Sequence, residues 1–341
     1  MASGAQLIGQ DILETLEMHT CLEPVRIIQS GYPNIEGTTI LEKRQFVTKH
    51  LDHLRTRLIC EPRGSRAMYG VIPVKPDLPN ADMAVLFMHN EGYSTMCGHA
   101  VIALGRYAID YGIVPAVAPE TKVNIQCPCG LVTVFVEYSE GKSGRARFIS
   151  VPSYIFSQDS QIELPGYGVI HYDIAYGGAF YAVALVTQFG LDLKTSGYEA
   201  LRSAAASLTE LLRKTIKLQH TDSDLAFLYG TILIDENDNT EEICNNFVVF
   251  GDAQVDRSPC GSGTTARIAI QFYKHNLKLG QQRMFTGPSG GKFIAQAVKE
   301  ESIGAGKNGI IVEVSGHGYY SGMCRFSHES DDPFCDGKLM D

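Results

Sequence analysis

Two stretches of the chain decide the fold, FMHNEGYSTMCGHAVIA (Phe87–Ala103) and FGDAQVDRSPCGSGTTA (Phe250–Ala266). In each, an apolar run ends at the Phe, a Cys-Gly pair follows ten residues later, and an apolar segment with helical spacing comes after the pair. The two cysteines lie about half of the 341-residue chain apart. This correspondence predicts an internal duplication, with its boundary in the turn-rich stretch 141–153.

The rest of the chain mixes short β-rich runs with a few amphipathic helices. Runs rich in Val, Ile and aromatic residues, bounded by Gly, Pro, Asp or Asn, predict strands at 71–74, 84–88, 122–126, 131–138, 180–186, 231–235, 246–250 and 309–314. Helical spacing predicts helices at 42–57, 100–111, 198–218 and 264–275. Because strands and helices do not strictly alternate, the pattern indicates an α+β fold with mostly antiparallel strands.

Composition narrows the function classes. Hydrophobic residues make up 44% and charged residues 20% of the chain, as in a globular protein with a real core. The net charge of -9 and the absence of a Lys/Arg-rich block argue against nucleic acid or an anionic membrane surface as a partner. The longest apolar run, Ile174–Val186, is shorter than the roughly 18–20 residues of a membrane span. Since the N-terminus also lacks the basic and apolar regions of a secretory signal, we expect a cytoplasmic protein with free thiols.

The two Cys-Gly pairs share a physical design. The N-terminus of a helix carries unpaired backbone N–H groups and about half a positive charge, which lower the pKa of a thiol placed there and hold a carboxylate. Gly98 and Gly261 leave room for a ligand to approach the backbone.

Two such helix starts facing each other would bind one carboxylate and present a thiol to each face of the neighbouring carbon. This is machinery for inversion at an α-carbon, where one base removes the proton and a conjugate acid supplies another from the opposite face. The backbone N–H groups would stabilise the developing carbanion. A matched pair of cysteines chosen only for packing is the plain alternative.

Five segments resemble signature sequences of the proline racemase family. They are MCGHA (Met96–Ala100), DRSPCGSGTTA (Asp256–Ala266), EPRG (Glu61–Gly64), YDIAYGG (Tyr172–Gly178) and EMHT (Glu17–Thr20). The resemblance runs from about residue 15 to the DPFCDG segment near the C-terminus. It implies the diaminopimelate epimerase-like fold, with two pseudo-symmetric α+β domains and the active site in the cleft between them. It also implies a homodimer that uses no cofactor.

The repeated pattern places the boundary between the two domains after residue 153. We therefore expect a first domain at residues 1–153, which carries Cys97, and a second at 154–324, which carries Cys260. The tail at about 325–341 is expected to pack back on the first half. By resemblance, Cys97 and Cys260 are the two catalytic thiols.

The resemblance also assigns the substrate-binding residues. Two turns would hold the carboxylate, Gly98 with His99 and Gly261 with Ser262. Asp256 would take the ring nitrogen, and a carboxylate suits a secondary ammonium because it accepts both of its hydrogen bonds.

The family divides by the residue at the second catalytic position. In the family, cysteine at both catalytic positions is typical of proline racemase and 4-hydroxyproline epimerase. Cysteine at the first position with Thr at the second is typical of trans-3-hydroxy-L-proline dehydratase. Cys260 therefore favours inversion of proline or a hydroxyproline. Tyr69 matches an aromatic position near the substrate ring, and its hydroxyl would suit a ring hydroxyl. The substrate is thus expected to be small, and a hydroxyproline is preferred over proline.

The flanking sequence points to the alternative reaction. Four segments look closer to the animal trans-3-hydroxyproline dehydratases: HNEGYSTMCGHA (89–100), LDHLRTRL (51–58), DLAFLYGTIL (224–233) and NIQCPCGLVTVFV (124–136). The alternative is therefore a dehydratase that gives a pyrroline-2-carboxylate, with Cys97 as the α-proton base. We give the catalytic position precedence because it takes part in the bond-making step.

Other readings of the sequence are weaker. Cys127-Pro128-Cys129 lacks the second ligand pair that a metal site needs, so no metal is expected. TGPSGGKF (Thr286–Phe293) lacks the spacing and the final Ser or Thr of a phosphate-binding loop. A thiol-redox role and a binding module without activity are the remaining classes. Cys21 and Leu22 replace two glycines of the family pattern, which puts the conformation of that turn in doubt.

Overall fold

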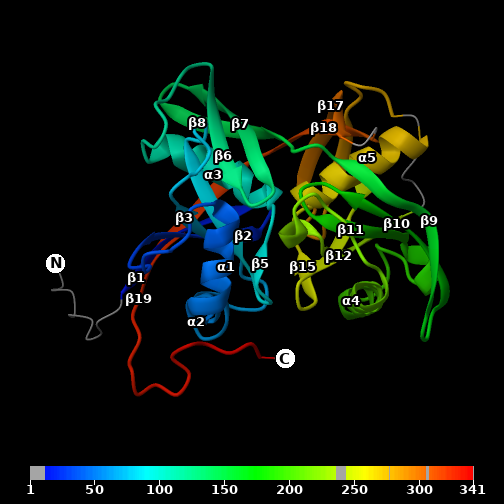
Figure 1. Ribbon diagram of the computed structural model, residues 1–341, viewed down its shortest axis with the longest axis horizontal. Helices are drawn as coiled ribbons and strands as arrows, with labels where there is room; N and C mark the ends of the chain where they lie inside the picture. Colours follow the sequence, from blue (N-terminus) through cyan, green and yellow to red (C-terminus); the bar gives the residue numbers. More distant parts are fainter. Residues whose placement is uncertain (1–11, 236–242, 276, 305–306, 341) are drawn as a thin grey trace.

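Strands make up most of the regular secondary structure and fall into two sheets. The computed structural model describes residues 12–235, 243–275, 277–304 and 307–340. Two lobes lie side by side, one built mainly from the first half of the chain and one from the second (Figure 1).

The larger sheet has 13 strands. Its members are β1 (Leu13–Thr20), β2 (Glu23–Ser30), β3 (Gly70–Val74), β4 (Met83–Met88), β5 (Tyr93–Ser94), β6 (Glu120–Cys127), β7 (Gly130–Ser139), β8 (Lys142–Ile149), β13 (Cys244–Asn245), β16 (Arg283–Thr286), β17 (Lys292–Gly304), β18 (Lys307–Gly316) and β19 (Gly318–Phe326). Their order is β13-β16-β17-β18-β8-β7-β6-β4-β3-β2-β1-β19, with β5 paired to β4. Because β18 pairs with β8, the sheet runs without a break from one half of the chain into the other.

The smaller sheet has six strands in the order β15-β14-β12-β11-β10-β9. These are β9 (Tyr154–Leu164), β10 (Gly168–Tyr176), β11 (Phe180–Leu185), β12 (Leu228–Ile234), β14 (Phe247–Phe250) and β15 (Gln254–Asp256). Among the strands of the described ranges, the parallel pairs are β2–β3, β4–β6, β11–β12 and β13–β16, and the others are antiparallel. The prediction of an α+β fold with mostly antiparallel strands is confirmed.

Five α-helices accompany the sheets in the part of the chain that the structure describes. They are α1 (Ile40–His50), α2 (Asp52–Ile59), α3 (Gly98–Asp110), α4 (Tyr198–Thr215) and α5 (Gly261–His275). The single helix predicted at 42–57 is wrong, because the chain leaves helical geometry at Leu51, which caps the end of α1 and the start of α2. The other three helices are confirmed. A capping box between Thr39 and Glu42 fixes the start of α1.

The helices that follow the two Cys-Gly pairs lie in the core. Helix α3 is apolar on nearly every side and packs against β8, β1 and β7, whereas α5 packs against β9, β10, β17 and β18. The amphipathic helix α4 covers the smaller sheet through β12 and β14. Each Cys-Gly pair is thus held between a strand that ends beside it and a helix that is buried behind it.

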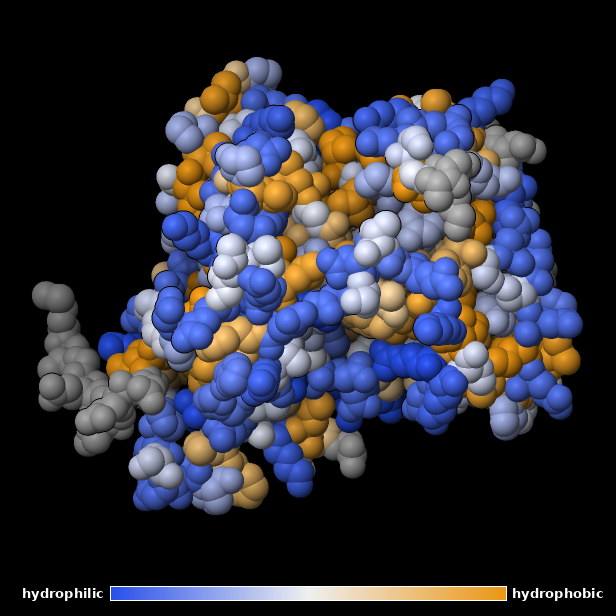
Figure 2. All heavy atoms as spheres, in the orientation of Figure 1, coloured by the Kyte–Doolittle hydropathy of each residue, from blue (hydrophilic) through white to orange (hydrophobic). Residues whose placement is uncertain are grey.

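The C-terminal segment lies against the first half of the chain. Lys338 donates its backbone N–H to the carbonyl of Glu61 at 2.9 Å, and Arg57 forms an ion pair with Asp336 at 2.6 Å. The domain limits at 153 and 324 stay a prediction. No helix among the described residues is long and apolar enough to cross a membrane. The face in Figure 2 carries mostly hydrophilic side chains, with hydrophobic ones scattered between them.

Candidate active site

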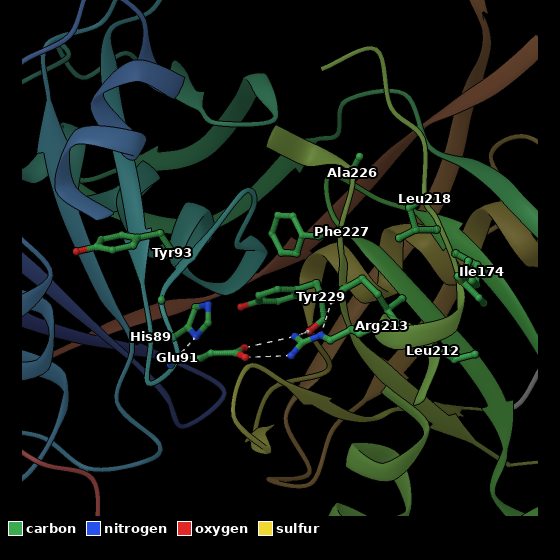
Figure 3. A pocket seen from close by; sticks show the side chains of 13 residues that line it. His89, Glu91, Tyr93, Ile174, Leu212, Arg213, Leu218, Ala226, Phe227 and Tyr229 are labelled. Carbon is green, nitrogen blue, oxygen red and sulfur yellow. Dashed lines mark hydrogen bonds and ion pairs between the residues drawn. The ribbon is translucent and has the colours of Figure 1, made fainter. Parts of the chain in front are cut away.

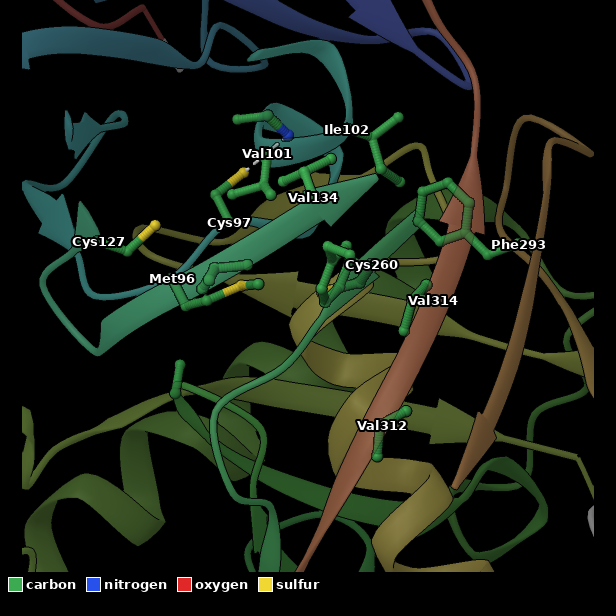
Figure 4. Close-up of a cluster of buried hydrophobic side chains, with 14 of the residues drawn as sticks. Met96, Cys97, Val101, Ile102, Cys127, Val134, Cys260, Phe293, Val312 and Val314 are labelled. Atoms are coloured by element: carbon green, nitrogen blue, oxygen red, sulfur yellow. Dashed lines mark hydrogen bonds between the residues drawn. The ribbon is translucent and has the colours of Figure 1, made fainter. Parts of the chain in front are cut away.

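The two cysteine-bearing helix starts meet where the lobes join. Cys97 is the N-cap of α3, and Cys260 directly precedes Gly261, the first residue of α5. A Cβ added to Gly98 would lie 2.5 Å from the Cα of Gly261, and a Cβ added to Gly261 would lie 2.5 Å from the Cα of Gly98. Only glycine fits at either position. Both thiols belong to one buried cluster (Figure 4), and each cysteine is 4% exposed.

Cys97 is surrounded by polar groups of its own helix turn. Its Sγ accepts from the backbone N–H of Ala100 at 3.4 Å and lies 3.2 Å from Nδ1 of His99. The Nε2 atom of His99 lies 3.2 Å from the carbonyl oxygen of Pro24, which can only accept, so Nε2 carries the proton and Nδ1 faces the thiol as an acceptor. Burial lowers the pKa of His99 to about 3, which keeps the imidazole neutral.

Cys260 has a different backbone and different neighbours. Its φ of 62° lies in the left-handed region, which costs a side-chain-bearing residue about 1–2 kcal/mol. Its backbone N–H donates to Ser258 Oγ at 3.0 Å, which helps to hold this conformation. The hydroxyl of Tyr181 lies 3.4 Å from its Sγ and 2.8 Å from Ser262 Oγ. Strain of this kind at a non-glycine residue is typical of functional sites.

The expected lowering of the thiol pKa is wrong for this closed arrangement. Burial raises the pKa of Cys97 well above its usual range, and the N–H of Ala100 lowers it by less. Burial, followed by the negative charge of Asp256, raises the pKa of Cys260. Removal of the thiolate from water therefore outweighs the helix N-terminus, and both thiols are protonated in this arrangement.

Two buried carboxylates lie beside Cys260. Asp256 ends β15, is 2% exposed, and accepts from the backbone N–H of Ser258 at 2.8 Å. Burial raises its pKa to about 6. Glu23, at the start of β2, accepts from the backbone N–H of Arg257 at 2.9 Å and from its Nε at 3.2 Å. Glu23 therefore ties the first half of the chain to the loop that carries Asp256 and Cys260.

Hydroxyl groups gather near Cys97. The hydroxyl of Tyr69 lies 2.5 Å from Ser94 Oγ, and both residues are buried. This hydroxyl partly offsets the rise that burial causes in the pKa of the Cys97 thiol. Burial likewise raises the pKa of Tyr229, and the neighbouring hydroxyls of Tyr69 and Ser94 partly offset that rise.

All eight residues predicted for the site lie around this junction. Their roles as catalytic or binding groups stay a prediction. The sequence argument missed Glu23, Ser94, Tyr181 and Tyr229. Tyr181 and Tyr229 lie in apolar strands, where aromatic side chains usually form part of the core. The one sequence signal of a further role is the hydroxyl group of each, which needs a hydrogen-bond partner when it is buried.

A pocket of about 410 Å³ adjoins the site between the lobes (Figure 3). Neither thiol lines it. The rings of His89 and Tyr229, 5.6 Å apart, form its boundary on the side of Tyr69. Glu91 from one lobe and Arg213 from the other form an ion pair across it at 3.0 Å. This pair joins the lobes beside the site.

Three further sequence features have definite places. In the described ranges no three His, Cys, Asp or Glu side chains are arranged to hold a metal ion, and Cys127 and Cys129 are free thiols. TGPSGGKF joins β16 to β17 as a hairpin connection. Cys21 and Leu22 form the two-residue turn between β1 and β2 with φ values of 54° and 64°. The turn therefore keeps the left-handed geometry that two glycines would favour.

The chain matches the family described as "Proline racemase" over residues 15–339. It is 50% identical to the human protein named trans-3-hydroxy-L-proline dehydratase over 97% of this chain and 96% of the relative. It is 52% identical to the trans-L-3-hydroxyproline dehydratase of Xenopus tropicalis over 96% and 95%. The proline racemase of Clostridioides difficile is 34% identical over 96% and 98%.

Solved structures show the same fold. A probable proline racemase from Agrobacterium radiobacter with bound carbonate superposes with a TM-score of 0.91 at 26% identity, covering 96% of each chain. A hydroxyproline epimerase from Agrobacterium vitis with bound trans-4-hydroxy-L-proline superposes with a TM-score of 0.90 at 24% identity, covering 97% of this chain and 96% of that one. The predicted fold class is confirmed.

Proposed function

We propose, because the chain belongs to the proline racemase family, that Cys97 removes the α-proton of a proline-like amino acid and that the main reaction is dehydration of a trans-3-hydroxyproline. The observation that carries the proposal is the identity of about one half, over nearly the whole chain, with relatives named dehydratases, against one third with a named racemase. The sequence argument put inversion first, and these relatives favour its alternative.

The geometry of the site supports this assignment of roles. The first N–H groups of α3 and α5 have no partner inside their helices, so they are available to the substrate carboxylate. Asp256 provides a buried acceptor for the ring ammonium, and its negative charge is needed for that contact. A substrate held at these points presents its α-carbon between Cys97 and Cys260.

Dehydration uses only one of the two thiols. Once the Cys97 thiolate takes the α-proton, the electron pair left on the α-carbon forms a double bond to C3, and the bond from C3 to its hydroxyl breaks. The product is a pyrroline-2-carboxylate and water. Cys260 takes no part in these steps.

Inversion at the α-carbon is the second candidate function, and the Cys260 thiol favours it. A protonated thiol on the opposite face can return a proton to the carbanion. Its position beside Tyr181 and Ser262 supports this role. With a substrate that has no hydroxyl on C3, such as proline or 4-hydroxyproline, elimination of water is impossible and inversion is the remaining outcome.

Proton NMR in heavy water tests both functions. The enzyme is given trans-3-hydroxy-L-proline, trans-4-hydroxy-L-proline and L-proline in separate samples. We expect the 3-hydroxyproline ring signals to disappear as a pyrroline carboxylate forms. Exchange of the α-proton with accumulation of the opposite α-configuration in the other two samples would establish inversion. An enzyme that leaves 3-hydroxyproline unchanged while it epimerises 4-hydroxyproline would refute dehydration as the main reaction.

Three serine variants complete the test. Cys97→Ser is expected to abolish both reactions, and Cys260→Ser to abolish inversion while dehydration continues. Cys324→Ser is the matched control, because this half-buried cysteine lies on β19, outside the site. Loss of dehydration in Cys260→Ser alone would mean that the roles of the two thiols are reversed.

A further inference from the structure

The stereochemistry of the proposed substrate constrains where the leaving group must be protonated. In trans-3-hydroxy-L-proline the hydroxyl and the carboxylate lie on opposite faces of the ring. The hydroxyl therefore shares its face with the α-hydrogen. Whichever thiol removes that hydrogen, the group that protonates the departing oxygen must come from the same side. With Cys97 as the base, that side is the surroundings of Cys97.

Two phenols, Tyr69 and Tyr229, lie near Cys97, and Tyr69 is the one whose ring contacts His99 beside the thiol. Tyr69 directly precedes β3 and is 1% exposed. Its ring centre lies 5.0 Å from that of His99 in an edge-on contact, and Nδ1 of His99 lies 3.2 Å from Cys97 Sγ. The Tyr69 hydroxyl hydrogen bonds to Ser94, and it partly offsets the rise that burial causes in the pKa of the Cys97 thiol. The hydroxyl is thus next to the base, in the dry part of the site, and held by a second hydroxyl at 2.5 Å.

We propose that Tyr69 is the general acid that protonates the departing C3 hydroxyl, and this proposal rests on the dehydration proposed above. It goes beyond a binding contact between Tyr69 and a ring hydroxyl, because the phenol gives up its proton during the reaction. Ser94 is a positioning residue that holds the phenol toward the substrate.

The contact between Tyr69 and Cys97 returns the enzyme to its starting state. The Cys97 thiolate accepts the α-proton and becomes a thiol. The C3–O bond breaks with its electron pair on oxygen, and the oxygen takes the Tyr69 proton and leaves as water. The Tyr69 phenolate then takes the proton from the neighbouring Cys97 thiol. One water is formed, and no oxidant, reductant or cofactor is consumed.

Other groups beside Cys97 are less suited to this role. His99 is neutral, and its two ring nitrogens already face the Cys97 thiol and the Pro24 carbonyl. Asp256 must be charged to hold the ring ammonium, so it has no proton to give to the departing hydroxyl. Burial raises the pKa of Tyr69, which keeps the phenol protonated at neutral pH until a strongly basic oxygen leaves.

Tyr69→Phe separates proton removal from departure of the hydroxyl. In heavy water with trans-3-hydroxy-L-proline, we expect formation of the pyrroline carboxylate to fall by about 10²–10⁴-fold, the range for loss of a general acid. The carbanion still forms and takes deuterium from the solvent, so deuterium appears at the α-carbon of unreacted substrate. A merely structural role for Tyr69 would reduce both processes together.

A second substrate tests the leaving group itself. Fluoride departs without a proton, so Tyr69→Phe is expected to eliminate fluoride from trans-3-fluoro-L-proline within about fivefold of the wild-type rate. Tyr107→Phe is the matched control. Tyr107 is a buried phenol on α3 whose hydroxyl contacts Gln29 instead of the site, and its loss is expected to leave both rates unchanged.

Three results would overturn the proposal. Unchanged dehydration in Tyr69→Phe would mean that the thiol itself protonates the hydroxyl. If Tyr69→Phe slows elimination from the hydroxy and the fluoro substrates equally, Tyr69 has only a structural role. Loss of dehydration in Tyr181→Phe in place of Tyr69→Phe would put the acid on the Cys260 side. If the wild-type enzyme does not dehydrate trans-3-hydroxy-L-proline, the proposed function itself is refuted. The wild-type assay gives that result before any variant is measured.

Discussion

Substitution of Gly98 by alanine tests whether the two helix starts touch as the structure has them. The added Cβ would lie 2.5 Å from the Cα of Gly261, 3.0 Å from its carbonyl carbon and 3.1 Å from Cε1 of Phe148. Carbon atoms pack at about 3.5–4.0 Å, so the start of α3 must move away from α5 by about 1 Å. Two of the three obstacles are backbone atoms, which cannot turn aside as a side chain can.

Gly98→Ala is expected to reduce catalytic activity far more than the free energy of unfolding. Overpacking in a tight core costs about 1–3 kcal/mol. Alanine recovers about 0.5–1 kcal/mol in a helix relative to glycine, so the net loss is about 0–2.5 kcal/mol. A displacement of about 1 Å at the reacting groups, by contrast, costs on the order of 100-fold in rate. The variant is therefore expected to fold and to lose about 99% of its activity.

Dehydration of trans-3-hydroxy-L-proline and thermal unfolding are measured for Gly98→Ala, Gly261→Ala and Gly322→Ala. The first two should behave alike, because each added Cβ meets the other glycine at the same distance. Gly322 on β19 has open space where a Cβ would be placed, so its variant should match the wild type in both measurements. Wild-type activity in both Gly98→Ala and Gly261→Ala would refute the contact between the helix starts, and with it the placement of two thiols around one carbon.

Further predictions concern charge, strain and closure. The pKa of Asp256 is raised to about 6, so its charged form, which binds the ammonium, is lost as the pH falls through 6. The fall of kcat/KM that the Cys97 thiol already causes should therefore steepen by a further factor of about ten per pH unit below 6, and Asp256→Asn should have low activity without this steepening. Leu22→Gly should raise the free energy of unfolding, measured by chemical denaturation, by about 0.5–1 kcal/mol. Glycine relieves the left-handed backbone of Leu22, and the lost side chain is 58% exposed, so little packing is lost. A lower free energy of unfolding would show that the backbone of Leu22 is not strained. Glu91→Gln removes the half-exposed ion pair with Arg213 between the lobes, which is worth about 0.4–1 kcal/mol. Because the lobes then separate more often, iodoacetamide should alkylate the site thiols about twofold to fivefold faster. An unchanged rate would mean that the pair does not hold the lobes together.

The sequence predicts best those parts of the fold where local pattern and tertiary packing agree. The strands around 84–88 and 246–250 and the helices after Cys97 and Cys260 are buried and strongly apolar, and all were predicted. Strands β9 and β17 were missed because they are long, partly exposed and rich in polar residues, so their period-2 signal is weak. The helix break at Leu51 has no Gly or Pro to mark it.

The site shows a similar division. The two Cys-Gly pairs were singled out by their repeated pattern at helix starts, and Asp256, His99, Ser262 and Tyr69 were predicted from the family resemblance. Tyr181 and Tyr229 were missed because burial in a strand is the ordinary fate of an aromatic side chain, and only the fold brings their hydroxyls to the thiols. The direction of the thiol pKa shifts was missed for a related reason. Helix position can be read from sequence, but the depth of burial that outweighs it depends on the closure of two distant segments.

The raised thiol pKa values bear directly on catalysis. Both thiols are buried and protonated in this arrangement, so we expect the base to form where water and the helix N-terminus can stabilise a thiolate, which requires the lobes to separate. Closure over a substrate then removes water from that thiolate. The same burial that raises the pKa of Cys97 makes the trapped thiolate a stronger base. An α-proton of an amino acid is very weakly acidic, so a thiolate in water would be too weak a base to remove it at a useful rate. Burial of the thiols is therefore consistent with proton abstraction, provided that the ion pairs between the lobes open and close once in each turnover.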